Sequence, residues 1–361
     1  MKKRVLSFLT AAVMTAAMVL SGCSGSQTAA TTAAPAETKA EAAAETTAAK
    51  TEAATTTAAP AEKKEIVVGF SQVGAESDWR TANTESMKST FTEANGYKLI
   101  FDDAQQKQEN QLKAVRNFIQ QDVDYIVIAP VTETGWDTVL QEAKDAGIPV
   151  IIVDRMINVS DDSLYTAWVG SNFLQEGYDA VAWLDEYLKK NNRADDDINI
   201  VTLQGTIGSS AQIGRTNGVE EKMKDHPKWK MLERQTGEFT QAKGQEVMES
   251  FLKTYDDIDV VIAENDNMAF GAIDAIKAAG KTCGPKGDII IISFDAVAAA
   301  FDSMIAGDMN VSVECNPLHG PRVAEIIQKL EKGEEVDKIA YVKEGVYPAD
   351  TAEAEKPKRQ Y

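Results

Sequence analysis

Histidine and cysteine are both scarce in this chain, whose 361 residues include only two histidines and three cysteines. With only His226 and His319 available, there is little material for a histidine-based metal site or a Ser-His-Asp catalytic relay. Among the cysteines, Cys23 follows an apolar leader, whereas Cys283 and Cys315 lie in differently placed segments, so we expect no disulfide framework. The functional groups therefore have to come from other residue types.

Basic residues are also fewer than acidic ones. The chain has 37 lysines and arginines but 56 aspartates and glutamates, which gives a formal net charge of −19. Nucleic-acid binding requires a basic footprint to neutralise phosphates, so the charge balance argues against a nucleic-acid partner. An acidic surface is compatible with solubility outside the cell.

The first 23 residues have the pattern of an export signal. Lys2, Lys3 and Arg4 precede an apolar stretch over residues 5–20, which is short for a membrane span. Residues 20–23, Leu-Ser-Gly-Cys, resemble a bacterial lipobox, which implies cleavage before Cys23 and diacylglycerol on its thiol. The alternative is an ordinary secretion signal with a chance cysteine. Lipidation at Cys23 predicts a protein anchored outside the cytoplasm to the cell membrane, in contact with the membrane there only.

Residues 24–64 are rich in alanine and threonine, with no aromatic and no branched aliphatic residue. Such a stretch cannot bury a core, so we expect a disordered tether between the lipid and a folded part of about 300 residues.

Beyond residue 64, apolar runs alternate with segments of helical periodicity, which is typical of βαβ units and parallel sheets. Strands are predicted at residues 66–70, 97–101, 124–129, 149–153, 164–168, 198–203, 230–234, 259–263, 288–294 and 309–314. Helices are predicted at residues 79–95, 105–121, 134–146, 172–190, 211–225, 241–254, 266–280, 297–306 and 318–332.

The two halves of the chain beyond residue 64 have similar sequence patterns. A strand at 124–129, a helix ending at Gly147 and a strand ending before Asp154 correspond to a strand at 259–263, a helix ending at Gly280 and a strand ending before Asp295. Two similar five-stranded α/β lobes are the simplest interpretation, with one long doubly wound sheet as the alternative.

Polar side chains occur where the nearly all-apolar strands end: Asp154, Arg155, Asn265 and Asp295. In open α/β sheets, ligands bind in the crevice outside the carboxyl ends of the strands. Carboxylate, guanidinium and amide groups at that edge indicate a ligand rich in hydroxyls. The structural alternatives are an ion pair between Asp154 and Arg155 and a helix cap at Asn265 or Asp266.

Further candidates come from loops that follow strands. The segment after the first strand can aim five side chains into the crevice: Ser71, Gln72, Glu76, Trp79 and Arg80. There an indole face suits a sugar ring, and a guanidinium can donate paired hydrogen bonds to hydroxyl oxygens. The alternative is that Trp79 packs under the first helix and Arg80 is solvated. Arg215, after the glycine-containing loop at 204–214, could reach a hydroxyl, and Glu314 ends the last predicted strand.

Several separate stretches together resemble one family, the periplasmic sugar-binding proteins of ABC importers in the ribose/galactose-type cluster. The similarity covers roughly residues 65 to 350, and its motifs lie at residues 69–74, 78–80, 105–110, 128–130, 134–136, 154–155, 203–206 and 246–251.

The resemblance implies the type I periplasmic binding protein fold: two doubly wound parallel-sheet α/β lobes joined by a three-stranded hinge. The first lobe is expected to comprise residues 65–169 and 315–341, and the second residues 170–314 and 342–361. The family's sugar contacts fall on Trp79, Arg80, Asp154, Arg155, Arg215, Asn265, Asp295 and Glu314.

Ribose binders typically have an aromatic residue at the position of Arg80 and an amide at that of Glu314. Both differences match the furanose-specific branch, so galactofuranose is the leading candidate, ahead of arabinofuranose, ribose and galactopyranose. We expect a monomer without catalytic residue, cofactor or metal, which delivers a monosaccharide to the permease subunits of an ABC transporter.

Two other functions remain open from sequence. One is a sugar sensor that presents its ligand to a chemoreceptor or a histidine kinase. The other is a glycoside hydrolase that uses two carboxylates among Asp154, Asp295 and Glu314. Neighbouring arginines are expected to lower the pKa values of these carboxyl groups and keep them ionised, which disfavours the hydrolase.

Overall fold

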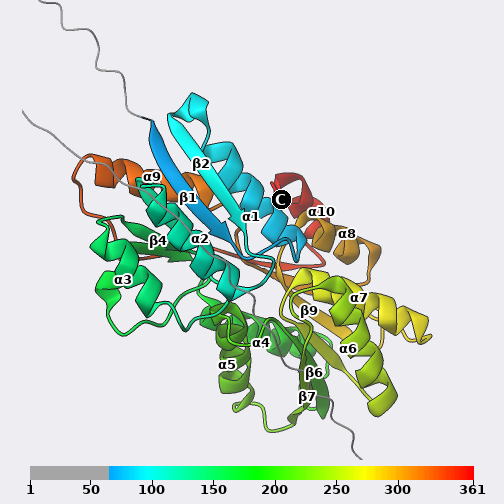
Figure 1. Ribbon diagram of the computed structural model, residues 1–361. Coiled ribbons are helices and arrows are strands. Elements are labelled where there is room, and N and C mark those ends of the chain that lie inside the picture. Colours follow the sequence, from blue (N-terminus) through cyan, green and yellow to red (C-terminus); the bar gives the residue numbers. More distant parts are fainter. Residues whose placement is uncertain (1–64) are drawn as a thin grey trace, which may run out of the picture. The chain divides into compact units, whose positions relative to one another are not determined.

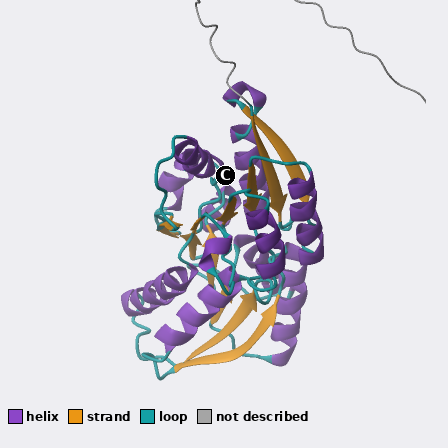
Figure 2. Cartoon of the chain, turned by 60° about the vertical axis from the view of Figure 1, so that its left-hand side comes forward, coloured by secondary structure: helices purple, strands orange, loops and turns teal. Residues whose placement is uncertain are grey.

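Two separate six-stranded sheets organise residues 65–361, the part of the chain that the computed structural model describes (Figure 1). Each sheet is covered by helices on both faces, as the side view in Figure 2 shows. The prediction of two α/β lobes is therefore confirmed, and the alternative of one long sheet is wrong. The predicted signal, lipidation site Cys23 and tether lie outside the described residues.

The first sheet has the strand order β11-β5-β4-β3-β1-β2, and all its pairings are parallel. Its strands are β1 (Ile66–Gln72), β2 (Tyr97–Asp103), β3 (Tyr125–Ile128), β4 (Val150–Val153), β5 (Ala167–Gly170) and β11 (Ile339–Tyr341). Its helices are α1 (Asp78–Thr90), α2 (Gln108–Gln120), α3 (Asp137–Asp145) and α9 (Gly320–Glu331), with short 3₁₀ turns at Glu93–Asn95 and Asp162–Leu164.

Burial explains why these strands read as apolar runs. Every residue of β3 and β4 is buried, because α1 and α9 cover one face of the sheet and α2 and α3 cover the other. Met87 and Ile327 belong to the core on the first face, and Phe118 and Leu140 to the core on the second. The edge strand β2, by contrast, is mostly half-buried or exposed.

The second sheet has the order β12-β10-β9-β8-β6-β7, and only the β10–β12 pair is antiparallel. Its strands are β6 (Ile198–Gln204), β7 (Trp229–Thr236), β8 (Val260–Ala263), β9 (Ile290–Asp295), β10 (Val311–Glu314) and β12 (Val346–Pro348). Its helices are α4 (Phe173–Lys190), α5 (Ser210–Met223), α6 (Gln241–Thr254), α7 (Asp266–Ala278), α8 (Ala298–Ala306) and α10 (Ala352–Glu355), followed by a 3₁₀ turn at Lys356–Lys358.

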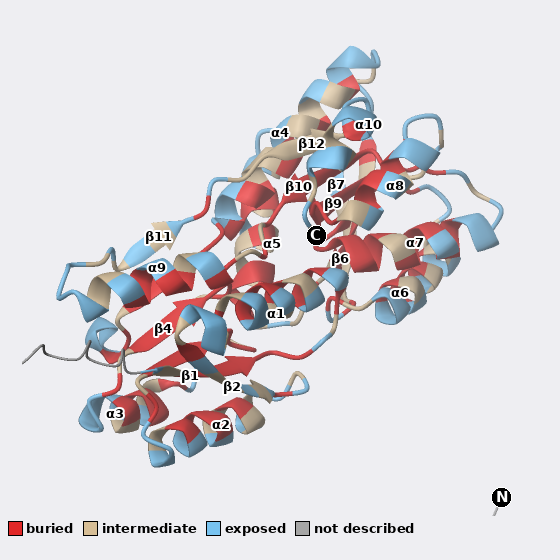
Figure 3. Ribbon diagram, turned by 90° about the horizontal axis from the view of Figure 1, so that it is seen from above, coloured by how far each residue is buried: buried red, intermediate tan, exposed pale blue. Residues whose placement is uncertain are grey.

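Three elements had no counterpart in the sequence-based prediction: β11, β12 and α10. Both strands have three residues, and none of these six residues is buried, as the tan and pale blue ribbon of Figure 3 shows. Their apolar runs are very short, and they give each lobe a sixth strand.

The chain passes between the sheets three times, after β5, after β10 and after β11. These crossings are bonded to one another. The backbone N–H of Glu314 donates to the carbonyl of Gly345 at 2.8 Å, and that of Val342 to Gly170 at 2.9 Å. The Ser171 hydroxyl donates to Glu344 at 2.6 Å. The crossings form the predicted three-stranded hinge, whereas the exact domain limits stay a prediction.

Within residues 65–361, no helix combines the length and the apolar character that crossing a membrane requires.

Candidate ligand site between the lobes

A small cavity lies at the carboxyl ends of both sheets, and residues of both lobes line it. The first lobe contributes Glu76, Ser77, Trp79, Arg80, Asp154 and Arg155; the second contributes Phe173, Ala211, Arg215, Phe239, Asn265 and Asp295; the hinge contributes Cys315. Seven of the nine predicted site residues are in this lining.

The strand ends explain this convergence. Asp154 and Arg155 directly follow β4, and Asp295 is the last residue of β9. Both aspartates have left-handed backbone conformations, with φ of 61° at Asp154 and 108° at Asp295, which residues other than glycine adopt uncommonly. Such backbone strain tends to occur at functional sites. The equivalence of the two aspartates, predicted from the internal repeat, thus extends to their backbone.

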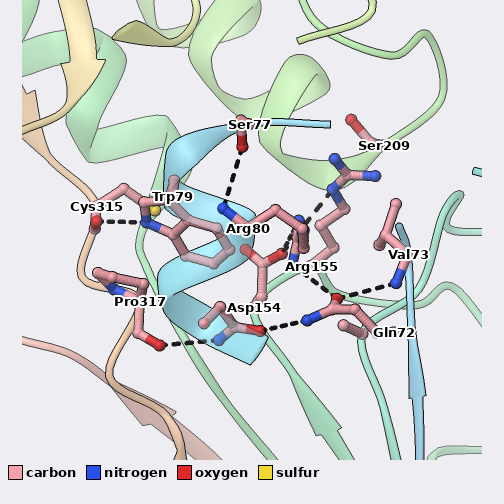
Figure 4. Close-up of polar contacts among 12 residues, drawn as sticks. Gln72, Val73, Ser77, Trp79, Arg80, Asp154, Arg155, Ser209, Cys315 and Pro317 are labelled. Atoms are coloured by element: carbon pink, nitrogen blue, oxygen red, sulfur yellow. Dashed lines mark hydrogen bonds and ion pairs between the residues drawn. The ribbon is translucent and has the colours of Figure 1, made fainter. Parts of the chain in front are cut away.

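Charged side chains of the first lobe pair inside the cavity (Figure 4). Arg80 Nη2 lies 2.7 Å from Asp154 Oδ2, and Arg80 Nε lies 3.0 Å from Glu76 Oε1. Arg155 Nη2 lies 3.5 Å from the same Glu76 oxygen, and Arg155 Nη1 donates to the carbonyl of Val131 at 3.1 Å. The alternative of a solvated Arg80 is wrong, because this residue is 2% exposed.

These contacts determine the charges of the groups. Burial alone would raise the pKa of Asp154, but Arg80 and Arg155 outweigh burial and hold it below its usual value. Burial and the guanidiniums of Arg80 and Arg215 lower the pKa of Arg155 to about 10, against the opposing effect of Glu76 and Asp154. Arg155 stays charged at neutral pH, but it is poorly compensated, which favours a ligand that brings acceptor oxygens.

The second lobe repeats the arrangement around Arg215. Its Nε lies 2.6 Å from Glu176 Oε2, its Nη2 lies 3.4 Å from Asp295 Oδ1, and its Nη1 donates to the carbonyl of Glu264. Burial raises the pKa of Asp295 well above its usual value although Arg215 is adjacent, and nearby Asp266 raises it further. The expectation that neighbouring arginines lower the pKa therefore holds for Asp154, whereas at Asp295 the effect of burial exceeds that of Arg215 and raises the pKa.

Aromatic rings form the apolar walls of the cavity. The Trp79 indole N–H donates to the carbonyl of Cys315 at 2.6 Å, and the ring packs with buried apolar residues of the second lobe. The Arg155 guanidinium lies 5.0 Å from the Phe239 ring centre, and that of Arg215 lies 5.4 Å from Phe173. Trp79 thus reaches the cavity, and the flat faces beside charged groups suit a ring with apolar C–H faces and polar edges.

Asn265 has two roles. Its side-chain oxygen accepts from the backbone N–H of Met268 at 3.0 Å and caps α7, while its amide donates to the Phe239 carbonyl at 3.1 Å. The neighbouring Asp266 is buried instead, and it accepts from Ser312 at 2.8 Å. The cap was expected at one of these two residues, and Asn265 provides it while lining the cavity.

Gln72 and Glu314 do not line the cavity. The Gln72 side chain supports the site from behind: its oxygen accepts from Arg80 at 3.2 Å, and its amide donates to Asn83 at 2.9 Å.

The Glu314 carboxylate accepts from Tyr361 at 2.8 Å, from Arg359 at 3.1 Å, from Tyr347 at 3.2 Å and from the Gly345 backbone at 3.0 Å. With these partners, Glu314 stabilises the hinge. Neither side chain lines the cavity, so a ligand contact for Gln72 or Glu314 stays a prediction.

One group of potential metal ligands occurs within residues 65–361: Glu176, Cys315 and Glu344, whose ligand atoms lie within 4.8 Å of one another. Arg215 already occupies one Glu176 oxygen, and Ser171 binds Glu344. Burial raises the pKa of the Cys315 thiol, which keeps it protonated. These contacts account for Oε2 of Glu176 and for Glu344, whereas Oε1 of Glu176 has no hydrogen-bond partner. Cys283 and Cys315 are both free, as expected.

Comparison with known proteins gives the family. The model of the periplasmic binding protein domain matches residues 68–335. The chain belongs to this family. The periplasmic binding protein fold has its ligand site between two hinged lobes, which is where the cavity lies here.

Among periplasmic binding proteins, the galactofuranose-binding protein YtfQ of Escherichia coli (strain K12) is 44% identical to this chain over 299 residues, or 82% of this chain and 92% of YtfQ. A Mycobacterium smegmatis protein solved in complex with β-D-fucofuranose is 44% identical, with a TM-score of 0.78, and the match covers 82% of this chain and 95% of that protein.

The periplasmic component of the arabinose ABC transporter from Shewanella sp. ANA-3, solved with α- and β-L-arabinofuranose, is 46% identical. Its TM-score is 0.76, and the match covers 81% of this chain and 95% of that protein.

Proposed function

We propose that this protein binds a monosaccharide in its furanose form, galactofuranose or a related sugar, between its two lobes. The observation that carries the proposal is the cavity itself, where donors and acceptors from the segments that follow β1, β4, β6 and β8 and from the end of β9 meet between aromatic rings. Hydroxyl groups both donate and accept, so a sugar can satisfy guanidinium and carboxylate groups at once.

The sugars bound by the relatives narrow the range of candidate ligands. The proteins reported above were characterised or solved with galactofuranose, β-D-fucofuranose and L-arabinofuranose, and all three are five-membered-ring sugars. We infer the same ring form for this chain, with Asp154, Arg155, Arg215, Asn265 and Asp295 as polar contacts and Trp79 against one ring face.

Closure of the hinge provides the binding mechanism. A sugar that touches both lobes binds the closed form more tightly and shifts the population towards it. Direct bonds between the lobes surround the cavity: the Asp78 N–H donates to Asn267 Oδ1 at 3.0 Å, and the Met156 N–H donates to Ser210 Oγ at 2.7 Å. These contacts lie outside the cavity lining, so they stabilise closure without touching the ligand.

We further propose that the closed protein delivers its sugar to the permease subunits of an ABC transporter, outside the cytoplasm and tethered through lipidated Cys23. The family and the export signal in the sequence support this output. Loss of sugar uptake on gene deletion, with chemotaxis and kinase signalling unchanged, is the expected result. The reverse result would favour the sensor.

The alternative function of a glycoside hydrolase is compatible with the pKa directions in the cavity. The pKa is lowered at Asp154 and raised at Asp295, and glycosidases also use two carboxyl groups whose pKa values differ in this way. The relatives favour binding without turnover. Incubation with aryl furanosides is expected to release no aglycone, and release at a rate above that of heat-inactivated protein would contradict the proposal.

The test of the proposed function is a melting-shift and calorimetric screen of residues 65–361 against a panel of furanoses and pyranoses. We expect galactose and arabinose, which contain furanose forms at equilibrium, to raise the melting temperature. Asp154→Asn retains the shape of the side chain but removes its charge, and it should abolish the shift. A wild-type protein that no sugar stabilises would refute the proposal.

A further inference from the structure

The two lobes contain the same three-residue arrangement, which we call the Glu-Arg-Asp relay. In the first lobe, Glu76 binds Nε of Arg80 at 3.0 Å and Nη2 of Arg80 binds Asp154 at 2.7 Å. In the second lobe, Glu176 binds Nε of Arg215 at 2.6 Å, and Nη2 of Arg215 lies 3.4 Å from Asp295. The same guanidinium nitrogens have the same partner types in both lobes.

Each relay ends in an unsatisfied carboxylate oxygen. Glu76 uses Oε1 for its arginines, and its Oε2 is buried without a hydrogen-bond partner. Glu176 uses Oε2, and its Oε1 is likewise buried and unpartnered. Leaving a buried acceptor without a partner destabilises a protein, so such an atom points to a missing donor.

The two glutamates differ in one respect that decides their roles. Glu76 lines the cavity, whereas Glu176 does not. The side chain of Glu76 is 2% exposed, so a donor can reach its free oxygen only from the cavity or through rearrangement.

We propose that Glu76 is a direct ligand contact, whose free oxygen accepts a hydrogen bond from one sugar hydroxyl, while Glu176 is a positioning residue that orients Arg215. This inference rests on the proposed function and adds a specificity determinant to it. A carboxylate beside two guanidiniums accepts and does not donate, so it selects a hydroxyl against a deoxy position at the same carbon.

Glu76 also links the two arginines of the first lobe, because one of its oxygens lies 3.0 Å from Arg80 and 3.5 Å from Arg155. Binding of a hydroxyl to the other oxygen therefore connects the ligand to both guanidiniums through a single side chain. The sequence placed Glu76 among the side chains that the loop after the first strand can aim into the crevice, without a role of its own.

The test measures affinity by calorimetry for D-galactose and its 2-deoxy, 3-deoxy, 5-deoxy and 6-deoxy analogues, with wild type, Glu76→Gln and Glu176→Gln. For wild type, one deoxy analogue should bind about 10- to 100-fold more weakly than galactose, the expected effect of losing a hydrogen bond to a charged group. In Glu76→Gln, galactose itself should weaken, and the discrimination at that one position should fall to within about threefold.

Glu176→Gln is the matched control, because it changes the equivalent carboxylate outside the cavity. It should weaken all the sugars by a similar factor and leave the deoxy discrimination unchanged. Glu76→Ala, checked for an unaltered far-ultraviolet circular dichroism spectrum, is the second variant and should behave like Glu76→Gln.

A Glu76→Gln protein that discriminates among the deoxy sugars as wild type does would overturn the inference. So would loss of the same discrimination in Glu176→Gln. Failure of the proposed function is distinguishable, since wild type would then bind none of the sugars.

Discussion

Removal of a bond between the lobes provides a quantitative test of the closure mechanism. Asn267, in the first turn of α7, accepts a hydrogen bond at 3.0 Å from the backbone N–H of Asp78, at the start of α1 in the other lobe. Neither residue lines the cavity. Asn267→Ala therefore deletes a contact of the closed form without removing a ligand contact.

The size of the effect follows from the hydrogen bond. A net contribution of about 0.5–1.5 kcal/mol corresponds to a factor of about 2 to 12 in an equilibrium constant. Because the bond joins the two lobes, its loss reduces the closed population by this factor. The apparent sugar affinity falls equally when the closed form is a minority without ligand.

Stopped-flow fluorescence and calorimetry with L-arabinose measure this effect. We expect a weaker affinity that arises mainly from faster sugar dissociation, with the melting temperature of the ligand-free protein unchanged. Asn191→Ala is the control, because Asn191 bonds only within its own lobe, to the Tyr187 carbonyl at 2.7 Å. Unchanged affinity and dissociation rate in Asn267→Ala would refute the closure mechanism.

Other substitutions test the fold around the site. In Gly205→Ala, the added Cβ would lie 1.9 Å from the Phe239 ring, so we expect the free energy of unfolding in urea to fall by about 1–3 kcal/mol; an unaltered value would contradict the packing. Burial raises the pKa of Glu264 to about 7, so the stability that protonated Glu264 contributes is present below its unfolded pKa near 4.5 and is lost as pH rises through 7. Glu264→Gln should therefore flatten the fall in melting temperature between pH 5 and pH 8. A pH profile identical to that of the wild type would contradict the raised pKa of Glu264. Arg359→Ala removes one donor from buried Glu314 and should lower the free energy of unfolding by about 1–3 kcal/mol, whereas an effect below 0.5 kcal/mol would show that the hinge does not need this contact.

The sequence predicted most of the fold because strands buried on both faces are almost purely apolar. Each of the ten predicted strands corresponds to an observed one within a few residues. The strands β11 and β12 were not predicted because each has only three residues, none of which is buried. Their position depends on contacts with β5 and β10, which are distant in sequence.

The candidate site was predictable where polar residues interrupt this apolar pattern, as at Asp154 and Asp295. It was not predictable where a residue has an ordinary local explanation. Glu176 lies in the first turn of α4, where an acidic residue is expected beside the helix dipole. Phe173 and Phe239 line the cavity, but in the sequence they cannot be distinguished from residues of the hydrophobic core.

Glu314 shows the limit of transferring contacts by position. Its carboxylate is occupied by Tyr347, Arg359 and Tyr361, from a segment more than 30 residues further along that has no strong sequence pattern. Only the three-dimensional structure reveals these partners and the position of Glu314 outside the cavity lining.

A crystal structure of residues 65–361 grown with L-arabinose or D-galactose is the most direct test of the central claim. We predict density for a five-membered sugar ring in the cavity, with hydroxyls within hydrogen-bonding distance of Asp154, Arg155 and Asp295 and one ring face against Trp79. Density for a sugar elsewhere, or for a six-membered ring that contacts one lobe only, would contradict the account.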